Sequence, residues 1–217
     1  VTDGEYIATA DVSVSIAAVN DTPVLAAVSD VSFDEDGSGD LSLSAGDVDG
    51  DDLTFSITGG SDITATLSGS DVSFSAPENY NGSETFTVSV TDGELSDSQS
   101  ITVTVNAVND APTANAAVGE TNEDESIVIV LSGDDVDGDA LIFSLDSDAT
   151  NGTVTLDGAL ATYAPNANYN GDDSFTFSVT DGEYIATADV SVSIAAVNDT
   201  PVLAAVSDVS FDEDGSG

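Results

Sequence analysis

The chain has 217 residues and carries 42 Asp and Glu side chains without any Lys, Arg, His or Cys, so its formal net charge is −42. This composition excludes nucleic-acid binding through basic side chains, catalytic triads built on His or Cys, zinc sites made of imidazole and thiolate, and disulfides. No apolar run is long enough to cross a membrane, so we expect no membrane insertion.

Apolar residues in the first half of the chain alternate with Ser and Thr. The pattern covers Leu53, Phe55 and Ile57, and then the runs 86–90 and 101–105. Strong acidity usually indicates disorder, but a chain with 40% hydrophobic residues in this alternation can bury one face of each strand. The pattern therefore predicts β-strands around a core.

The second half repeats the pattern, beginning with a short strand after Pro112. Asp157-Gly158 lies between two of the expected strands and predicts a hairpin. About seven short strands separated by Gly, Asp and Asn turns predict an all-β, antiparallel sandwich. The further strands expected in this half are 127–131, 140–145, 152–156, 159–163, 174–179 and 188–194.

An Asn-Asp-x-Pro element marks a fixed period. It occurs at 20–23, 109–112 and 198–201, with intervals of 109 − 20 = 89 and 198 − 109 = 89. In addition, residues 1–39 are identical to residues 179–217. Self-similarity at a fixed period predicts a tandem array. We expect the sequence to be a window on a longer array, with a C-terminal strand fragment of a preceding domain, domain A, domain B and an N-terminal fragment of the next domain at 1–20, 21–109, 110–198 and 199–217.

Acidic clusters recur at the same phase of each repeat. The stretch Asp-Val-Asp-Gly-Asp at 47–51 has a copy at 135–139, and 34–36 is matched by 123–125. Clustered carboxylates are the hard oxygen ligands that Ca²⁺ prefers, and a chain without basic side chains needs neutralising cations from solution. The alternative is a set of solvated turns, because Asp and Gly favour turns without any metal.

Taken in order, the Asn-Asp-x-Pro element, the Glu-containing turn, the Asp-x-Asp stretch and a late Asp-Gly resemble cadherin repeats. The Tyr-Asn-Gly…Phe stretches at 80–86 and 169–175 make the chain more similar still to the cadherin-like tandem repeats of large calcium-dependent bacterial surface adhesins, of the RTX-adhesin extender type. The resemblance implies seven-stranded, Ig-like Greek-key sandwiches in a linear array, with Ca²⁺ held between consecutive domains.

Carried over by motif, the resemblance implies three sets of calcium ligands. The junction that leads into domain A would use Asn20, Asp21, Asp47, Asp49 and Asp92. The junction between A and B would use Glu35, Glu84, Asn106, Asn109, Asp110, Asp135, Asp137 and Asp181. The junction that leaves B would use Glu123, Asp173, Asn198 and Asp199. Asn106 is replaced by Ala17 and Ala195 in the other copies, which leaves the number of ions per junction open.

These features favour a non-enzymatic role outside the cell. The first hypothesis is a calcium-stiffened structural extender of a secreted bacterial adhesin, which attaches cells to surfaces or to one another. The second is a subunit of a self-assembling extracellular filament or surface layer, and the third is an array of carbohydrate-binding modules. In the first two the partners are calcium ions and neighbouring repeats or copies of the same chain.

Overall fold

The computed structural model describes residues 1–210 and 213–214. The chain divides into two compact units, Val1–Val108 and Asn109–Gly217, which we call unit 1 and unit 2. Within the described residues every regular element is a β-strand, so no helix there could cross a membrane. The all-β prediction is confirmed.

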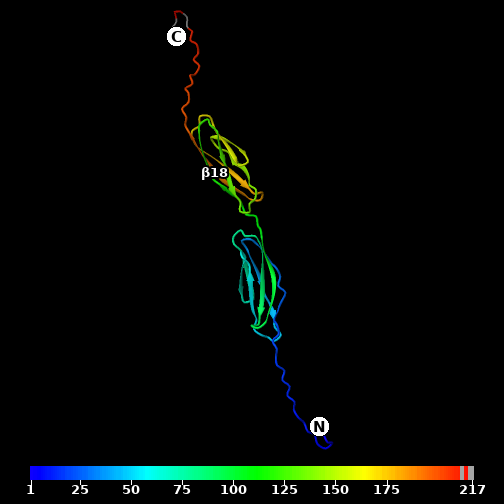
Figure 1. Ribbon diagram of the computed structural model, residues 1–217. Helices are drawn as coiled ribbons and strands as arrows, with labels where there is room; N and C mark the ends of the chain where they lie inside the picture. The colour runs from blue at the N-terminus through cyan, green and yellow to red at the C-terminus, as the bar shows by residue number, and fades with distance from the viewer. Residues whose placement is uncertain (211–212, 215–217) are drawn as a thin grey trace. The chain divides into compact units, whose positions relative to one another are not determined.

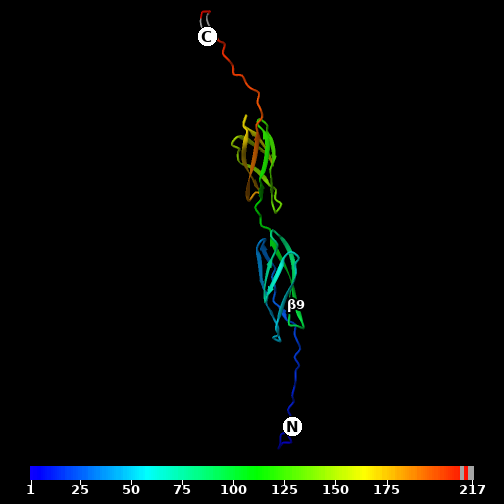
Figure 2. The same ribbon diagram turned by 90° about the vertical axis from the view of Figure 1, so that its left-hand side faces the viewer.

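Unit 1 is a two-layer sandwich. One sheet has the strand order β2-β9-β8-β5, the other has the order β3-β7-β6, and a short pair joins β1 to β4 (Figures 1 and 2). The strands are β1 (Val24–Leu25), β2 (Val31–Asp34), β3 (Ser38–Ser42), β4 (Ala45–Gly46), β5 (Thr54–Gly59), β6 (Thr64–Ser68), β7 (Asp71–Ser75), β8 (Gly82–Thr91) and β9 (Ser96–Asn106).

Unit 2 repeats this arrangement. Its sheets have the orders β11-β18-β17-β14 and β12-β16-β15, with a short β10-β13 pair. The strands are β10 (Thr113–Asn115), β11 (Ala117–Asn122), β12 (Ile127–Val130), β13 (Ser132–Asp134), β14 (Ile142–Ser147), β15 (Gly152–Asp157), β16 (Leu160–Pro165), β17 (Gly171–Thr180) and β18 (Ile185–Ala195).

The alternation seen in the sequence becomes burial in the sheets. In β8 the side chains of Phe86, Val88 and Val90 are 0–1% exposed, whereas the residues between them point away from the core. Successive side chains of a strand lie on opposite faces, so one face packs and the other meets water. Each unit therefore has its own core, centred on Phe74 and Phe86 in unit 1 and on Tyr163 and Phe177 in unit 2.

The sequence predicted an antiparallel sandwich, but each unit also contains one parallel pair of strands. β2 pairs in parallel with β9, with Phe33 opposite Val105, and β11 pairs in parallel with β18. Alternation reports which face is buried but not the direction of a partner strand. Because the first long strand and the last strand run the same way, the chain enters each unit at one end and leaves it at the other.

One local detail differs between the sequence prediction and the structure. The hairpin between β15 and β16 has Gly158 and Ala159 in its loop, because Asp157 pairs with Leu160. The turn is thus one residue later than Asp157-Gly158. Gly158 has φ +58°, a conformation that a residue with a Cβ rarely adopts.

The duplicated sequence at the two ends behaves differently in its two contexts. Val190 and Val192 of β18 are 0–1% exposed, whereas their identical copies Val12 and Val14 are 85% and 81% exposed. Residues 1–20 form only one isolated bridge, between Thr2 and Ile7. An identical sequence is therefore buried only where partner strands surround it.

Candidate metal sites at the acidic ends of the units

The Asn-Asp-x-Pro element of unit 1 is tied to two acidic loops. Nδ2 of Asn20 donates a hydrogen bond of 2.9 Å to Oδ2 of Asp92, and the amide of Asp21 donates one of 2.8 Å to Oδ2 of Asp49. Pro23, which follows, is buried. Residues 72 and 28 positions apart in the sequence are thereby gathered at the start of the unit.

The loop after β4 wraps around the carboxylate of Asp47. Oδ1 of Asp47 accepts hydrogen bonds from the amides of Asp49 and Gly50, at 2.8 and 3.0 Å. Gly50 has φ +81°, which lets the chain turn back tightly. As a result, one oxygen each from Asp47, Asp49 and Asp51 lie within 4.8 Å of one another. Three carboxylates this close repel one another unless a cation separates them.

Burial, and then the neighbouring negative charges, raise the pKa of Asp51. The carboxylates that contribute are, in decreasing order, those of Asp47, Asp49, Asp92 and Asp52. The opposite holds for Asp92, whose pKa is lowered by the amide of Leu95 and by further donors, including the side chain of Asn20.

Unit 2 repeats the main contacts of this arrangement. Nδ2 of Asn109 lies 2.9 Å from Oδ2 of Asp181, and the amide of Asp110 donates to Oδ2 of Asp137 at 2.8 Å. Oδ1 of Asp135 accepts the amide of Asp137 at 3.0 Å.

The carboxylate of Asp181 is held in the same way as that of Asp92. Burial acts to raise its pKa, but the amides of Tyr184 and Glu183 and the side chain of Asn109 outweigh burial and lower it. Both units therefore keep one strongly stabilised carboxylate beside the Asn-Asp-x-Pro element.

The donor set fits a hard cation. Oδ2 of Asp47 and Oδ2 of Asp135 are buried atoms without a hydrogen-bond partner, and a buried carboxylate oxygen without a partner is costly. The surrounding ligand atoms are carboxylate and amide oxygens, which suit Ca²⁺. Sequence reasoning named Asp47 and Asp49 but left out Asp51, although the stretch 47–52 contained the signal in its third alternate aspartate.

The opposite end of each unit has a buried glutamate beside the outgoing chain. Glu35 is 6% exposed, and its Oε1 accepts the amide of Val108, while its Oε2 is buried without a partner. Glu123, also 6% exposed, accepts the amide of Val197 and lies 3.4 Å from Nδ2 of Asn170. Each glutamate thus fixes the first residues after the last strand.

Glu84 lies in β8, and its side chain holds a neighbouring loop. Its carboxylate accepts hydrogen bonds from the amides of Ser61, Asp62 and Ile63, at 2.9 to 3.1 Å. These bonds, that of Ser61 first, lower the pKa of Glu84. Its two oxygens therefore already have donors within the loop that follows β5.

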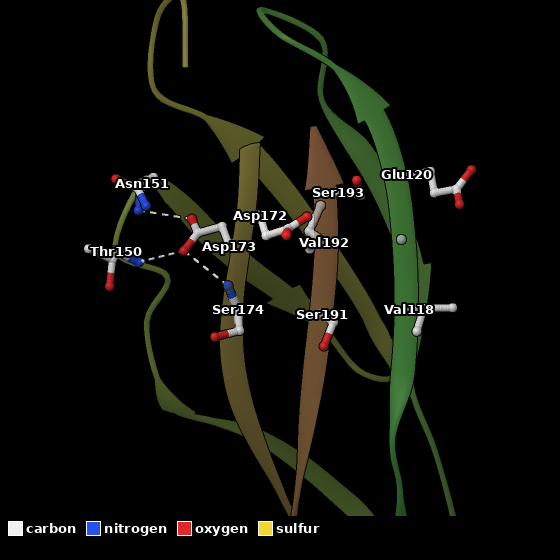
Figure 3. Close-up of a pocket in the computed structure, with 11 residues that line it drawn as sticks. Val118, Glu120, Thr150, Asn151, Asp172, Asp173, Ser174, Ser191, Val192 and Ser193 are labelled. Carbon is white, nitrogen blue, oxygen red and sulfur yellow. Dashed lines mark hydrogen bonds between the residues drawn. The ribbon is translucent and has the colours of Figure 1, made fainter. Parts of the chain in front are cut away.

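Asp173 has the corresponding place in unit 2. Its carboxylate accepts the amides of Thr150, Asn151 and Ser174, at 2.8 to 3.2 Å, beside a pocket of about 820 Å³ on the sheet of β11, β18 and β17 (Figure 3). The contacts of Glu84 and Asp173 hold loops, and their assignment as calcium ligands stays a prediction.

The remaining predicted ligands lie apart from these clusters or across a boundary. Nδ2 of Asn106 donates to Asp34, and Asn198 and Asp199 are exposed. The boundary between the units falls between Val108 and Asn109, so the predicted A–B set divides between them. That its two parts share ions stays a prediction.

Comparison with known families bears on the fold that carries these clusters. The bacterial Ig domain model matches residues 20–105 and again residues 109–194. The chain belongs to the bacterial Ig domain family. Both matches begin at an Asn-Asp-x-Pro element, so each Ig domain includes its own acidic loop. A comparison with curated proteins gives no match.

Solved structures show the same fold. The human protocadherin-24 EC1-2 structure, form II, has a TM-score of 0.55 and 17% identity, covering 81% of this chain and 99% of that one. An endo-fucoidan hydrolase from glycoside hydrolase family 107 has a TM-score of 0.35 and 23% identity over 82% of this chain, which spans 29% of the hydrolase. At 17% identity the likeness to protocadherin-24 shows the cadherin-like sandwich fold alone.

Proposed function

We propose that these tandem bacterial Ig domains are a structural extender of an extracellular bacterial adhesin, and that Ca²⁺ bound at their acidic ends stabilises and stiffens the array. The observation that carries the proposal is the repeated acidic set with buried, unpartnered oxygens at Asp47 and Asp135, in a chain with no basic side chain. The proposed role needs no catalytic group.

The residues would act as follows. In unit 1 the ion would be held by the carboxylates of Asp47, Asp49, Asp51 and Asp92. In unit 2 it would be held by those of Asp135, Asp137 and Asp181. Bound Ca²⁺ would supply the positive charge that offsets their repulsion. Because the ligands come together only in the folded unit, the free energy of binding adds to the free energy of unfolding.

Stiffening would follow from where the ligands are attached. Asn20 and Asp21 belong to the segment that leads into the sandwich of unit 1, and their contacts are to the loops of Asp92 and Asp49. An ion bound there would fix this segment to its unit and reduce the freedom of the linker. A surface adhesin in calcium-rich medium needs such a spacer to carry a binding tip away from the cell.

The test is a titration of the full chain with Ca²⁺ and, separately, Mg²⁺, followed by calorimetry, thermal unfolding and small-angle scattering. We expect Ca²⁺ to raise the unfolding temperature and to increase the maximum dimension, EDTA to reverse both, and Mg²⁺ to have a smaller effect. Asp47→Asn with Asp135→Asn should weaken binding about tenfold or more. Asp40→Asn, an exposed carboxylate on β3, is the charge-matched control. Equal unfolding temperatures in calcium and in EDTA would refute the proposal.

A further inference from the structure

Each core contains a glycine that faces large side chains of another strand, and the glycine lies on different strands in the two units. In unit 1 it is Gly39 of β3, where a Cβ would lie 2.7 Å from Cγ1 of Val31 and 2.7 Å from Cδ1 of Phe33. In unit 2 it is Gly119 of β11, where a Cβ would lie 2.6 Å from Cδ1 and 3.0 Å from Cγ1 of Ile129. Close packing of the core leaves no room for a side chain at either position.

The strand registers show that Val31 and Gly119 occupy the same place in the fold. Val31 pairs with Val103 of β9, and Gly119 pairs with Val192 of β18. The two partners are one repeat apart, since 192 − 103 = 89. The strand beside the last strand, which we call the first edge strand, therefore has a large residue at this position in unit 1 and none in unit 2.

The second strand shows the reverse. Gly39 of β3 pairs with Phe74 of β7, and Ile127 of β12 pairs with Tyr163 of β16. These partners are again one repeat apart, since 163 − 74 = 89. Val31 of unit 1 thus corresponds to Gly119 of unit 2, and Gly39 corresponds to Ile127. Side-chain volume is therefore exchanged between two facing strands.

A separate exchange occurs deeper in the core. Ile63, which precedes β6, is 3% exposed. Gly152 of β15 holds the equivalent place, because Ala65 and Val154, two residues further on, pair with Phe74 and Tyr163. A Cβ at Gly152 would lie 2.6 Å from Cζ of Tyr163. The two units are therefore different, mutually incompatible packings of one fold.

The neighbouring core positions also differ, because Phe33 and Leu41 of unit 1 correspond by register to Thr121 and Ile129 of unit 2. We propose that this reciprocal difference between the first edge strand and the facing strand sorts strands during folding, so that each unit accepts its own first edge strand and rejects that of its neighbour. Tethered repeats with similar strands are prone to misassembly, because the neighbouring strand is present at high effective concentration. Residues 107–116 between β9 and β11 reach at most roughly 35 Å, so β11 can compete with β2 for the edge of β9.

The two possible errors are both disfavoured by packing. β11 in the place of β2 would put Gly119 opposite Gly39 and leave a void. A valine strand in the place of β11 would drive its side chain into Ile127 and Ile129. A copy of the β2 sequence begins after β18, because Val209 is the identical copy of Val31 at 31 + 178 = 209, and it is 76% exposed.

The chain lacks cysteine, so introduced pairs can report which edge β11 occupies. Glu120 lies opposite Ser193 of β18, and Thr104 of β9 lies opposite Ser32 of β2. The pair Glu120→Cys with Ser193→Cys should crosslink when β11 is in its own unit. The pair Glu120→Cys with Thr104→Cys should crosslink only when β11 has taken the place of β2.

Each reporter is placed in four full-length chains that are refolded from urea at low concentration and then oxidised. The chains are the natural one, a unit 1 exchange (Val31→Gly, Phe33→Thr, Gly39→Ile and Leu41→Ile), a unit 2 exchange (Gly119→Val, Thr121→Phe, Ile127→Gly and Ile129→Leu), and the chain with both exchanges. Either single exchange gives both units the same residues at these positions, so we expect the misplaced crosslink to rise about tenfold. The double exchange makes the units differ again and should return the crosslink to its natural level.

The chain with both exchanges separates sorting from stability. If misplacement followed loss of stability, that chain would show the most of the Glu120→Cys with Thr104→Cys crosslink. An equal level in all four chains, or a level that grows with the number of substitutions, would overturn the proposal. Because calcium is held constant throughout, the result does not depend on whether the acidic ends bind it.

Discussion

The phenol oxygen of Tyr163 donates a hydrogen bond of 2.9 Å to Oδ2 of Asp173 inside unit 2. At the equivalent register positions unit 1 has Phe74 and Glu84, which cannot form this bond. Tyr163 is 0% exposed and Asp173 is 9% exposed. One fold thus connects its two sheets by a polar contact in one unit and by apolar packing in the other.

This contact predicts alkaline sensitivity of unit 2. Burial, and then the hydrogen bond and charge of Asp173, raise the pKa of Tyr163 well above its ordinary value of 10.0. A folded-state pKa above the unfolded value gives stability that is complete below about pH 10 and is lost as the pH rises towards the folded pKa. The unfolding temperature of unit 2 should therefore fall above about pH 10.

Tyr163→Phe should remove that alkaline component and lower the stability of unit 2 at neutral pH by about 1–3 kcal/mol, because Asp173 loses a donor. The matched control is Tyr184→Phe, at a side chain that is 43% exposed. Calorimetry from neutral to alkaline pH measures both effects. An unchanged pH profile in Tyr163→Phe would contradict the prediction.

Glu84→Gln should lower the unfolding temperature of unit 1 without changing calcium affinity. The amides of Ser61, Asp62 and Ile63 lower the pKa of Glu84 below its ordinary 4.5. A depressed folded pKa gives stability that is present above the unfolded value and lost as the pH falls through the folded one. Thermal unfolding in EDTA between about pH 7 and 3 tests this. A large loss of calcium affinity would instead make Glu84 a ligand, as its motif suggested.

Asp51→Asn should stabilise unit 1 in EDTA and destabilise it in calcium. The pKa of Asp51 is raised by burial and by the neighbouring carboxylates, so at neutral pH its charge opposes folding in the absence of a cation. With calcium bound, the same charge would be a ligand. The unfolding temperature of Asp51→Asn should therefore rise without the ion and fall with it. Asp52→Asn is the neighbouring control. A shift in the same direction under both conditions would count against this role.

Glu35→Ala and Glu123→Ala should free the amides of Val108 and Val197. Each amide donates to a buried glutamate oxygen across 73 or 74 residues of sequence. Loss of one hydrogen bond to a carboxylate should speed amide exchange at these positions about tenfold. Hydrogen exchange followed by nuclear magnetic resonance measures it, and the amide of Glu35 itself, bonded to the carbonyl of Asn106, provides an internal reference.

Much of the candidate site could be predicted because its ligands lie in short repeated stretches. Asp47 and Asp49 and their copies Asp135 and Asp137 stood out as alternate aspartates before a glycine. The contacts of Glu84 and Asp173 could not be predicted, because a carboxylate in a strand gives no sign of which loop amides will reach it. The direction of β2 beside β9 was equally hidden, since alternation is the same for parallel and antiparallel partners.

By itself the sequence determined the repeat, the β-strand content and the buried face of each strand, because period-2 alternation and an 89-residue period are properties of the letters alone. Only the tertiary structure decided which distant residues meet, such as Asn20 and Asp92, or Gly39 and Val31. Residues 1–20 and their identical copies at 179–198 give the reason. Burial and pairing depend on the strands that surround a segment, and a segment's own sequence does not contain them.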